Sequence, residues 1–243
     1  MKKQKIELYD DGIGNVELID HMGDDLTIVN AARVSFGKQK NELDEKDKKL
    51  IEYLAANKHT STFEHNVATF RFTVPLFVRG QHMRHRTWSY NEISRRYTDV
   101  DIRFYEPEKF RRQHQSNRQA STDELFVPML LTPIEPGVPY GYMRTPHPAI
   151  NIIKEHHKKS LKLYNKLIEK GVCREQARGV LPQNMYTEYY GTTNLNNLLK
   201  FINLRSHEGA QWEIQQVATA LLDMAEEMWP TAVGSYRKLK HSE

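Results

Sequence analysis

The chain has 243 residues, 39% of them hydrophobic, which is enough to bury the core of one large domain or two small ones. Its 35 Lys and Arg residues against 31 Asp and Glu residues give a net charge of +4, too small for the basic surface of a dedicated nucleic-acid-binding protein. The single cysteine, Cys173, excludes an internal disulfide framework and is typical of a reducing compartment.

The N-terminal third predicts a small sheet and two helices. Residues 1–9 are basic but lead to no apolar run, so we expect neither a signal peptide nor a membrane span there, and a cytoplasmic protein. Turn residues and hydrophobic periods indicate strands at Ile6–Tyr9 and Val16–Ile19, helices at Leu26–Val34 and Asp44–Ala56, and an alternating, half-buried strand at Val67–Pro75.

The middle of the chain holds an arginine motif and an insertion. Pro75 is suited to the first position of a helix that continues to Arg86, so the motif is expected to end a helix. Trp88–Ser94 is predicted to be a loop and Ile102–Tyr105 a short strand. Residues 111–147 form a polar, proline-rich insertion whose conformation the pattern does not determine.

The C-terminal part predicts mainly helices. We expect a long helix at Pro148–Lys170, a strand at Met185–Thr193, a helix capped by Asn194, and a helix at Gly209–Met228 stopped by Pro230. The stripe of the long helix that we expect in the core comprises Ala149, Ile152, Ile153, His156, Ser160, Leu163, Tyr164 and Leu167. The whole chain, 1–243, is predicted to be a single α+β domain with a central, mainly antiparallel sheet flanked by helices.

Arginines are concentrated in one stretch, and a guanidinium can pair bidentately with phosphate oxygens. They are Arg79, Arg84, Arg86, Arg95, Arg96, Arg103, Arg111 and Arg112. Successive side chains diverge at Arg84-His85-Arg86, so two neighbouring anionic ligands are expected, and the polar residues after the motif suit phosphate and ribose. The alternative is a basic helix end on a solvated face, followed by a polar loop.

The run Arg84-His85-Arg86-Thr87-Trp88-Ser89-Tyr90-Asn91-Glu92-Ile93-Ser94-Arg95-Arg96-Tyr97 resembles the signature of flavin-dependent thymidylate synthases. In that family, two arginines flanking a histidine are followed, seven residues on, by a serine. The resemblance extends to Ala31–Phe36, His59–His65, Ala177-Arg178 with Leu181-Pro182, and Leu204-Arg205 with Ala210–Glu213. It thus covers nearly the whole chain apart from residues 111–147.

The resemblance implies a set of ligand-binding residues. Those expected to hold deoxyuridylate (dUMP) are Gln81, His82, Met83, Arg84, Glu92, Ile93, Ser94, Arg95, Arg96, Arg178 and Arg205. Those expected around FAD are Ser61, Arg84, His85, Arg86, Glu92, Asn194, Asn196 and Lys200. Arg205 matches the arginine that contacts the pyrimidine base and favours its ionisation, which makes it the candidate catalytic residue. Asn196 and Lys200 depart from the family pattern, which commonly has Arg and Asn or His there.

The activity implied by the resemblance is reductive methylation of dUMP to dTMP. Methylenetetrahydrofolate would supply the carbon, NADPH the electrons, and bound FAD would relay hydride, in a homotetramer with shared active sites. Nothing around Cys173 resembles the nucleophile motif of the cysteine-using thymidylate synthase, so no protein nucleophile is expected. The thiol of Cys173 is either incidental or activated by its position at the start of a helix. The histidine spacings indicate no metal site.

Two other functions fit parts of the sequence. The arginine cluster could bind nucleic-acid phosphates while Trp88 and Tyr90 stack on bases, although such aromatic residues are more often packing residues. Alternatively, the protein could be a flavin-dependent redox enzyme acting on another nucleotide, in which Arg205 does not contact uracil.

Overall fold

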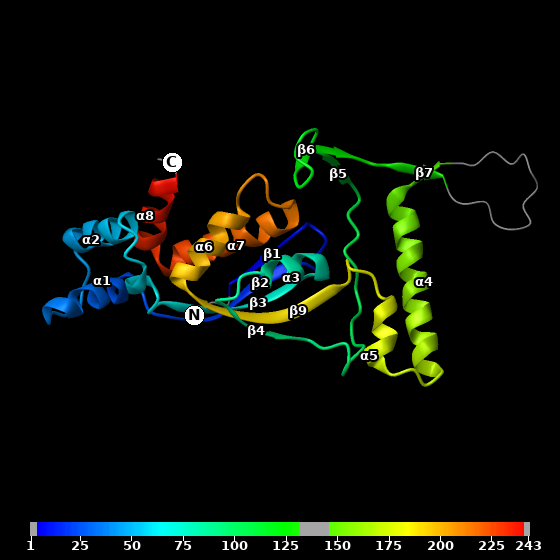
Figure 1. Cartoon of the computed structure of the whole chain (residues 1–243), viewed down its shortest axis with the longest axis horizontal. Helices are drawn as coiled ribbons and strands as arrows, with labels where there is room; N and C mark the ends of the chain where they lie inside the picture. The colour runs from blue at the N-terminus through cyan, green and yellow to red at the C-terminus, as the bar shows by residue number, and fades with distance from the viewer. Residues whose placement is uncertain (1–3, 132–145, 241–243) are drawn as a thin grey trace, which may run out of the picture. The chain divides into compact units, whose positions relative to one another are not determined.

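The structure, a computed structural model, describes residues 4–131 and 146–240. Its contacts define two compact units. The first comprises Met1–Val74, Val78–Glu92 and Glu188–Glu243, and the second comprises Pro75–Phe77 and Ile93–Thr187. Figure 1 labels the helices and strands of both. None of the helices within the described ranges is both long and apolar enough to cross a membrane.

A five-stranded sheet with strand order β1-β2-β3-β9-β4 forms the centre of the first unit. Its strands are β1 (Lys5–Glu7), β2 (Asn15–Met22), β3 (Val67–Pro75), β4 (Ser89–Glu92) and β9 (Tyr186–Asn194). The pairs β1–β2, β2–β3 and β4–β9 are antiparallel. The predicted α+β class with an antiparallel sheet is confirmed, and β3 has the bounds that its alternating pattern predicts.

The prediction that Trp88–Ser94 is a loop is wrong, because Ser89–Glu92 is strand β4. Its residues pair with Tyr189–Thr192 of β9 at the edge of the sheet. The segment is polar and short, as edge strands often are, so its composition resembles that of a loop. The first strand also ends earlier than predicted, since Tyr9 and Asp10 adopt left-handed φ values of 67° and 53° and turn the chain.

Helices account for most of the remaining first unit. They are α1 (Asp25–Arg33), α2 (Glu45–Ala56), the end of α3 (Leu76–His82), α6 (Leu195–Arg205), α7 (Trp212–Met228) and α8 (Pro230–Lys240), with short 3-10 helices η1 (Val34–Phe36) and η2 (Thr60–Phe63). Capping boxes at Asp24 and Asp44 start α1 and α2, and Asn194 caps α6, as its sequence predicts. Helix α8 packs against α2 (Figure 1).

The last helix was not expected. Helix α7 ends at Met228 as predicted, but Pro230 begins α8 instead of ending helical structure. Proline is tolerated there because the first turn of a helix does not use the backbone N–H that proline lacks. The carboxylate of buried Asp25 accepts hydrogen bonds from the backbone N–H groups of Thr231 and Ala232, at 2.7 and 3.0 Å, and so caps this helix from α1. The indole of Trp229 donates to the carbonyl of Gly23 at 3.0 Å.

The second unit contains a long helix and two small hairpins. Its elements are β5 (Phe110–Gln113), β6 (Ser121–Phe126), β7 (Met129–Leu131), β8 (Pro146–Pro148), α4 (Ala149–Glu169), α5 (Arg174–Ala177) and the 3-10 helix η3 (Arg178–Val180). The insertion at 111–147 therefore contains strands at its two sides, while residues 132–145 lie outside the described part. The predicted strand at Ile102–Tyr105 is wrong, as only an isolated bridge joins Phe104 to Met185.

One histidine of α4 was assigned to the wrong face. His157, not His156, is buried, and Leu163 of the predicted stripe is 47% exposed. The imidazole of His157 stacks on Phe104, its Nδ1 lies 2.6 Å from Oε1 of Glu106, and its Nε2 lies 2.8 Å from Nδ2 of Asn184. With the amide of Asn184 donating to Nε2, the Nδ1–H of His157 donates to Glu106.

Candidate functional site

The arginine motif lies in a turn after α3, not at the end of the helix itself. Pro75 ends β3, and α3 runs only from Leu76 to His82, which corrects the expected helix from Pro75 to Arg86. The backbone N–H of His85 donates to the carbonyl of His82 at 3.0 Å, closing the turn. Arg84 and Arg86 are exposed on either side of half-buried His85.

Tyr90 holds this turn in place. Its hydroxyl lies 3.0 Å from the carbonyl oxygen of His82 and 3.1 Å from that of His85, so one phenol serves both ends of the turn. Burial raises the pKa of Tyr90, which keeps the hydroxyl protonated as the donor. From the sequence alone, Tyr90 is expected to stack on a ligand ring or to pack in the core. Its hydrogen bonds were missed because they depend on β4 running back beside the motif.

Arg205, at the end of α6, contacts the same turn. Its Nε donates to Nε2 of His85 at 3.1 Å, and its Nη2 donates to the carbonyl of Gln81 at 3.1 Å. Burial, followed by the charge of Arg205, lowers the pKa of His85 to about 4, so the imidazole is neutral near pH 7. Burial and the neighbouring charge of Arg84 lower the pKa of Arg205.

His82 belongs to the core beneath the motif. Its side chain is buried among Phe72, Trp88 and Phe201, and Nδ1 lies 2.8 Å from the hydroxyl of Tyr189. Burial lowers the pKa of His82 well below its ordinary value, with smaller effects from His85 and Arg205. A ligand at the motif would therefore meet the backbone of His82 and not its imidazole.

Polar side chains extend the site toward α7 and β4. The amide of Gln81 donates to the side chain of Gln211, which donates in turn to Glu213 at 2.8 Å. Glu92 forms an ion pair with Arg79. Arg84 and Arg86, by contrast, form no ion pair with any residue in the described ranges. Two unpaired guanidiniums in one turn, with Arg84 close enough to Arg205 to lower its pKa, fit a phosphate-bearing ligand such as a nucleotide or a flavin dinucleotide.

The remaining dUMP candidates lie in the second unit, apart from half-buried Met83 in the turn. Ile93 is partly exposed, and Ser94 Oγ accepts from the backbone N–H of Arg96 at 3.3 Å. The guanidinium of Arg96 lies 3.6 Å from Glu175 in α5. Arg178, which directly follows α5, is exposed.

Arg95 differs from its neighbours because its side chain is buried. Its Nη1 and Nη2 donate to the carbonyls of Val100 and Asp101 at 2.6 and 3.4 Å, and burial lowers its pKa. Arg95 therefore orders the segment after Ser94 within its own unit, whereas Arg96 and Arg178 present their charges at the surface.

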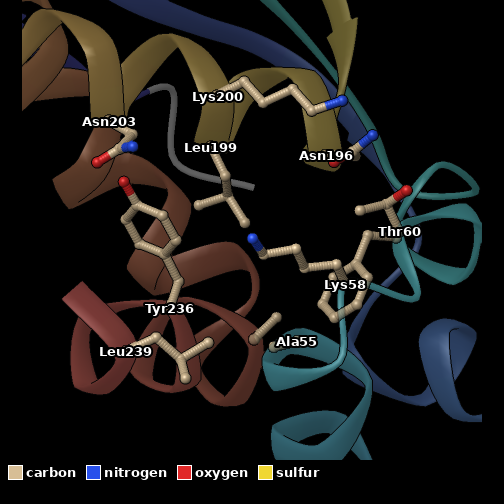
Figure 2. A pocket seen from close by; sticks show the side chains of 11 residues that line it. Ala55, Lys58, Thr60, Asn196, Leu199, Lys200, Asn203, Tyr236 and Leu239 are labelled. Carbon is tan, nitrogen blue, oxygen red and sulfur yellow. The ribbon is translucent and has the colours of Figure 1, made fainter. Parts of the chain in front are cut away.

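Several flavin candidates gather around a pocket of about 300 Å³ beside α6 (Figure 2). Asn196 and Lys200 line it, and Ser61 directly follows the lining residue Thr60. The amide of buried Asn196 donates to Glu64 at 2.8 Å. Asn194 accepts from the backbone N–H of Asn197 at 3.0 Å and starts α6. In the described part of the chain, no cluster of His, Cys, Asp and Glu side chains is suited to a metal ion.

The comparisons with known proteins agree with one another. The family model described as "Thymidylate synthase complementing protein" matches residues 17–231. A flavin-dependent thymidylate synthase from Thermus thermophilus is 41% identical over 225 residues, covering 93% of this chain and 76% of the relative. Relatives of the same description from Thermosipho melanesiensis and Thermotoga neapolitana are 39% and 40% identical, covering 94% and 96% of this chain and 92% and 94% of their own lengths.

A solved structure shares the fold. The UMP/dUMP methylase PolB from Streptomyces cacaoi, bound with 5-Br dUMP, superposes with a TM-score of 0.74 at 31% identity, covering 96% of this chain and 97% of that one. The chain therefore shares the α+β fold of this nucleotide methylase. The chain belongs to the flavin-dependent thymidylate synthase family.

Proposed function

We propose that this protein catalyses the reductive methylation of dUMP to dTMP. Methylenetetrahydrofolate donates the one-carbon unit, NADPH is the electron source, and FAD is the resident cofactor. Family membership and the dUMP analogue in the related methylase support the reaction. The observation that carries it is the arrangement of Arg205, held by His85 and the Gln81 carbonyl beside the unpaired Arg84.

The side chains have distinct roles in this proposal. Arg205 contacts the uracil ring and stabilises the negative charge that develops there, because its guanidinium is already fixed before the ligand arrives. His85 keeps Arg205 in place as a neutral hydrogen-bond acceptor and adds no charge of its own. Arg84, Arg96 and Arg178, with Ser94, bind the phosphate and sugar of dUMP.

The flavin is held by a second set of residues. Arg86 and His85 of the turn, Ser61 near η2, and Asn194, Asn196 and Lys200 at the start of α6 contribute to it, with Glu92 and Arg84 shared between the two ligands. When bound, FAD carries reducing equivalents between the nicotinamide and the nucleotide. The protein contributes position and charge, without a covalent nucleophile.

The protein is proposed to act as a cytoplasmic homotetramer in which one catalytic domain, residues 1–243, is interrupted by the insertion at 111–147. Large apolar side chains in β6, in β7 and between these strands support the association of subunits, because they are exposed. These side chains are Leu125, Val127, Met129, Leu130 and Leu131.

Release of tritium from C5 of labelled dUMP tests this function. Purified protein with FAD should release tritium and form dTMP only when methylenetetrahydrofolate and NADPH are both present. A protein that binds no FAD, or that binds FAD but leaves dUMP unchanged under these conditions, would contradict the proposal. Salt-dependent binding of oligonucleotides without dUMP binding would support a nucleic-acid-binding protein instead.

A further inference from the structure

Arg79 differs from Arg84 and Arg86 because its guanidinium already has an acidic partner. It forms an ion pair with Glu92, whereas Arg84 and Arg86 form none with any residue in the described ranges. Glu92 is the only acidic residue among those proposed to hold dUMP or FAD. The ion pair therefore joins an arginine outside the proposed ligand-binding set to the single negative charge within that set.

The ion pair connects the two elements on either side of the arginine turn. Arg79 lies in α3 and Glu92 ends β4, 13 positions later and within the same unit. The backbone carbonyl of Arg79 also accepts from the N–H of Met83 at 3.0 Å. Together with the hydroxyl of Tyr90, the guanidinium thus holds β4 against the end of α3 and fixes the place of the Glu92 carboxylate beside the turn.

Both charges of the pair act on a buried tyrosine below the turn. Glu92 lies opposite Tyr189 of β9, whose hydroxyl is 2.8 Å from Nδ1 of His82. Burial is the main cause of the raised pKa of Tyr189; Tyr90 and Glu92 raise this pKa further, whereas Arg79 lowers it. The guanidinium therefore offsets the field of the carboxylate inside the site.

The magnitude of the pair favours a role in binding over one in stability. The side chains of Arg79 and Glu92 keep 37% and 20% of their exposure, and ion pairs this open to water add little to stability. The ligands, however, are anionic. A carboxylate without its partner would repel a nearby phosphate, at a cost of roughly tenfold in affinity.

We propose that Arg79 is a positioning residue for Glu92. It holds the carboxylate where it can accept hydrogen bonds from sugar hydroxyls, and it cancels the carboxylate's charge so that phosphate-bearing ligands can bind beside it. This inference rests on the proposed function, in which Glu92 is shared between dUMP and FAD. Arg79 itself contacts neither ligand.

Titration of the FAD-loaded protein with dUMP, followed by calorimetry, tests this role. Arg79→Leu should weaken dUMP binding about tenfold, and Arg79→Lys, which keeps the charge, should stay within about threefold of the wild type. In a Glu92→Gln background, Arg79→Leu should change the affinity by less than about twofold, because no carboxylate is left to offset.

The ion pair between Arg71 and Glu17 provides a matched control. It joins β3 to β2 at 2.7 Å, with side chains 37% and 10% exposed. Arg71→Leu should lower the thermal midpoint as little as Arg79→Leu does, and should leave dUMP affinity unchanged. A general loosening of the sheet would instead weaken dUMP binding in both variants and overturn the proposal.

Steady-state kinetics separates positioning from a direct contact. Arg79→Leu should raise the KM for dUMP while kcat changes less than about twofold, since Arg79 touches no reacting atom. Equal losses of dUMP affinity with and without Glu92 would show that Arg79 binds the ligand itself and would overturn the inference. So would a lysine variant no better than the leucine variant, a comparison that holds even if Glu92→Gln binds dUMP too weakly to measure. Wild-type protein that binds no dUMP would overturn the proposed function instead.

Discussion

Arg205 and His85 lie 120 residues apart in the sequence and share one hydrogen bond, from Nε of the guanidinium to Nε2 of the imidazole at 3.1 Å. The bond fixes the proton of neutral His85 on Nδ1, because Nε2 must accept. It also orients the cation that is proposed to contact uracil. The protonation state of one residue and the position of the other are therefore coupled.

Removing Arg205 should change the titration of His85. In Arg205→Leu, the pKa of His85 should rise from about 4 by about one unit, because a nearby cation disfavours the imidazolium. It should stay below the ordinary value of 6.5, since burial is the larger cause. Proton NMR of the imidazole C–H signals measures this. Arg237→Leu, an equal charge change in α8, should leave the signal unaffected; an unchanged titration in Arg205→Leu would show that the two side chains are not coupled.

The stability of the protein should fall as the pH is lowered from about 6.5 toward 4. His82 and His85 both have folded-state pKa values below their ordinary value, so the unfolded chain binds more protons in this interval. Urea unfolding at several pH values measures the slope. His85→Gln should give a shallower slope. A stability that is flat or rises on acidification would contradict the neutral state of both imidazoles.

Tyr90→Phe should loosen the arginine turn. The variant leaves the carbonyls of His82 and His85 without their shared donor and should lower the free energy of unfolding by about 1–3 kcal/mol. The pKa of His85 should shift as well, because its position relative to Arg205 depends on the turn. Urea unfolding and NMR titration test both effects. Tyr190→Phe, which removes an exposed hydroxyl from β9, is the control, and equal effects of the two variants would exclude a specific role for Tyr90.

Two adjacent histidines of α4 should respond differently to the same change. His157→Leu removes a buried imidazole, leaves partly buried Glu106 and Asn184 without their shared partner, and should cost about 2–3 kcal/mol. His156→Leu, on the exposed face, should change stability by less than about 0.5 kcal/mol. Chemical unfolding of both variants measures the two losses of stability. The buried assignment fails if His156 proves the more sensitive position.

Asp47 should be the most sensitive carboxylate near the start of α2. Its fully buried side chain accepts hydrogen bonds from Arg33 and Lys40 and from the backbone N–H of Asp44. Asp47→Asn should cost about 2–3 kcal/mol, less than the loss of a fully buried pair because Arg33 and Lys40 keep contact with water. Glu45→Gln, whose carboxylate is exposed, should cost about 0.5 kcal/mol or less. Thermal unfolding of both variants measures the two costs.

Local patterns predicted the elements whose signals lie in adjacent residues. The alternation of Val67–Pro75 defines β3, and Asp44 and Asn194 cap the helices that follow them. Strand β4 was missed because its polar residues are specified by pairing with β9, which is distant in the sequence. Helix α8 was missed because a proline can either end a helix or begin the next one.

The features of the candidate site also fall into two classes, those visible in the sequence and those that depend on tertiary structure. The arginine motif and its family resemblance are visible in the sequence, as is the importance of Arg205. The hydrogen bonds of Tyr90, the Arg79–Glu92 ion pair and the position of Lys200 at the pocket depend on tertiary structure. The burial of Arg95 likewise depends on carbonyls five and six residues later, so its charge alone could not distinguish it from Arg96.

The cap that Asp25 provides to α8 has a consequence for synthesis of the chain. Its two backbone partners follow it by 206 and 207 positions, so a ribosome must release nearly the entire polypeptide before this buried carboxylate can be satisfied. Until then, Asp25 lacks these two donors and α1 lacks the helix that packs against it. The N-terminal region is therefore expected to complete its folding last, and nascent chains halted before Thr231 should remain sensitive to proteases.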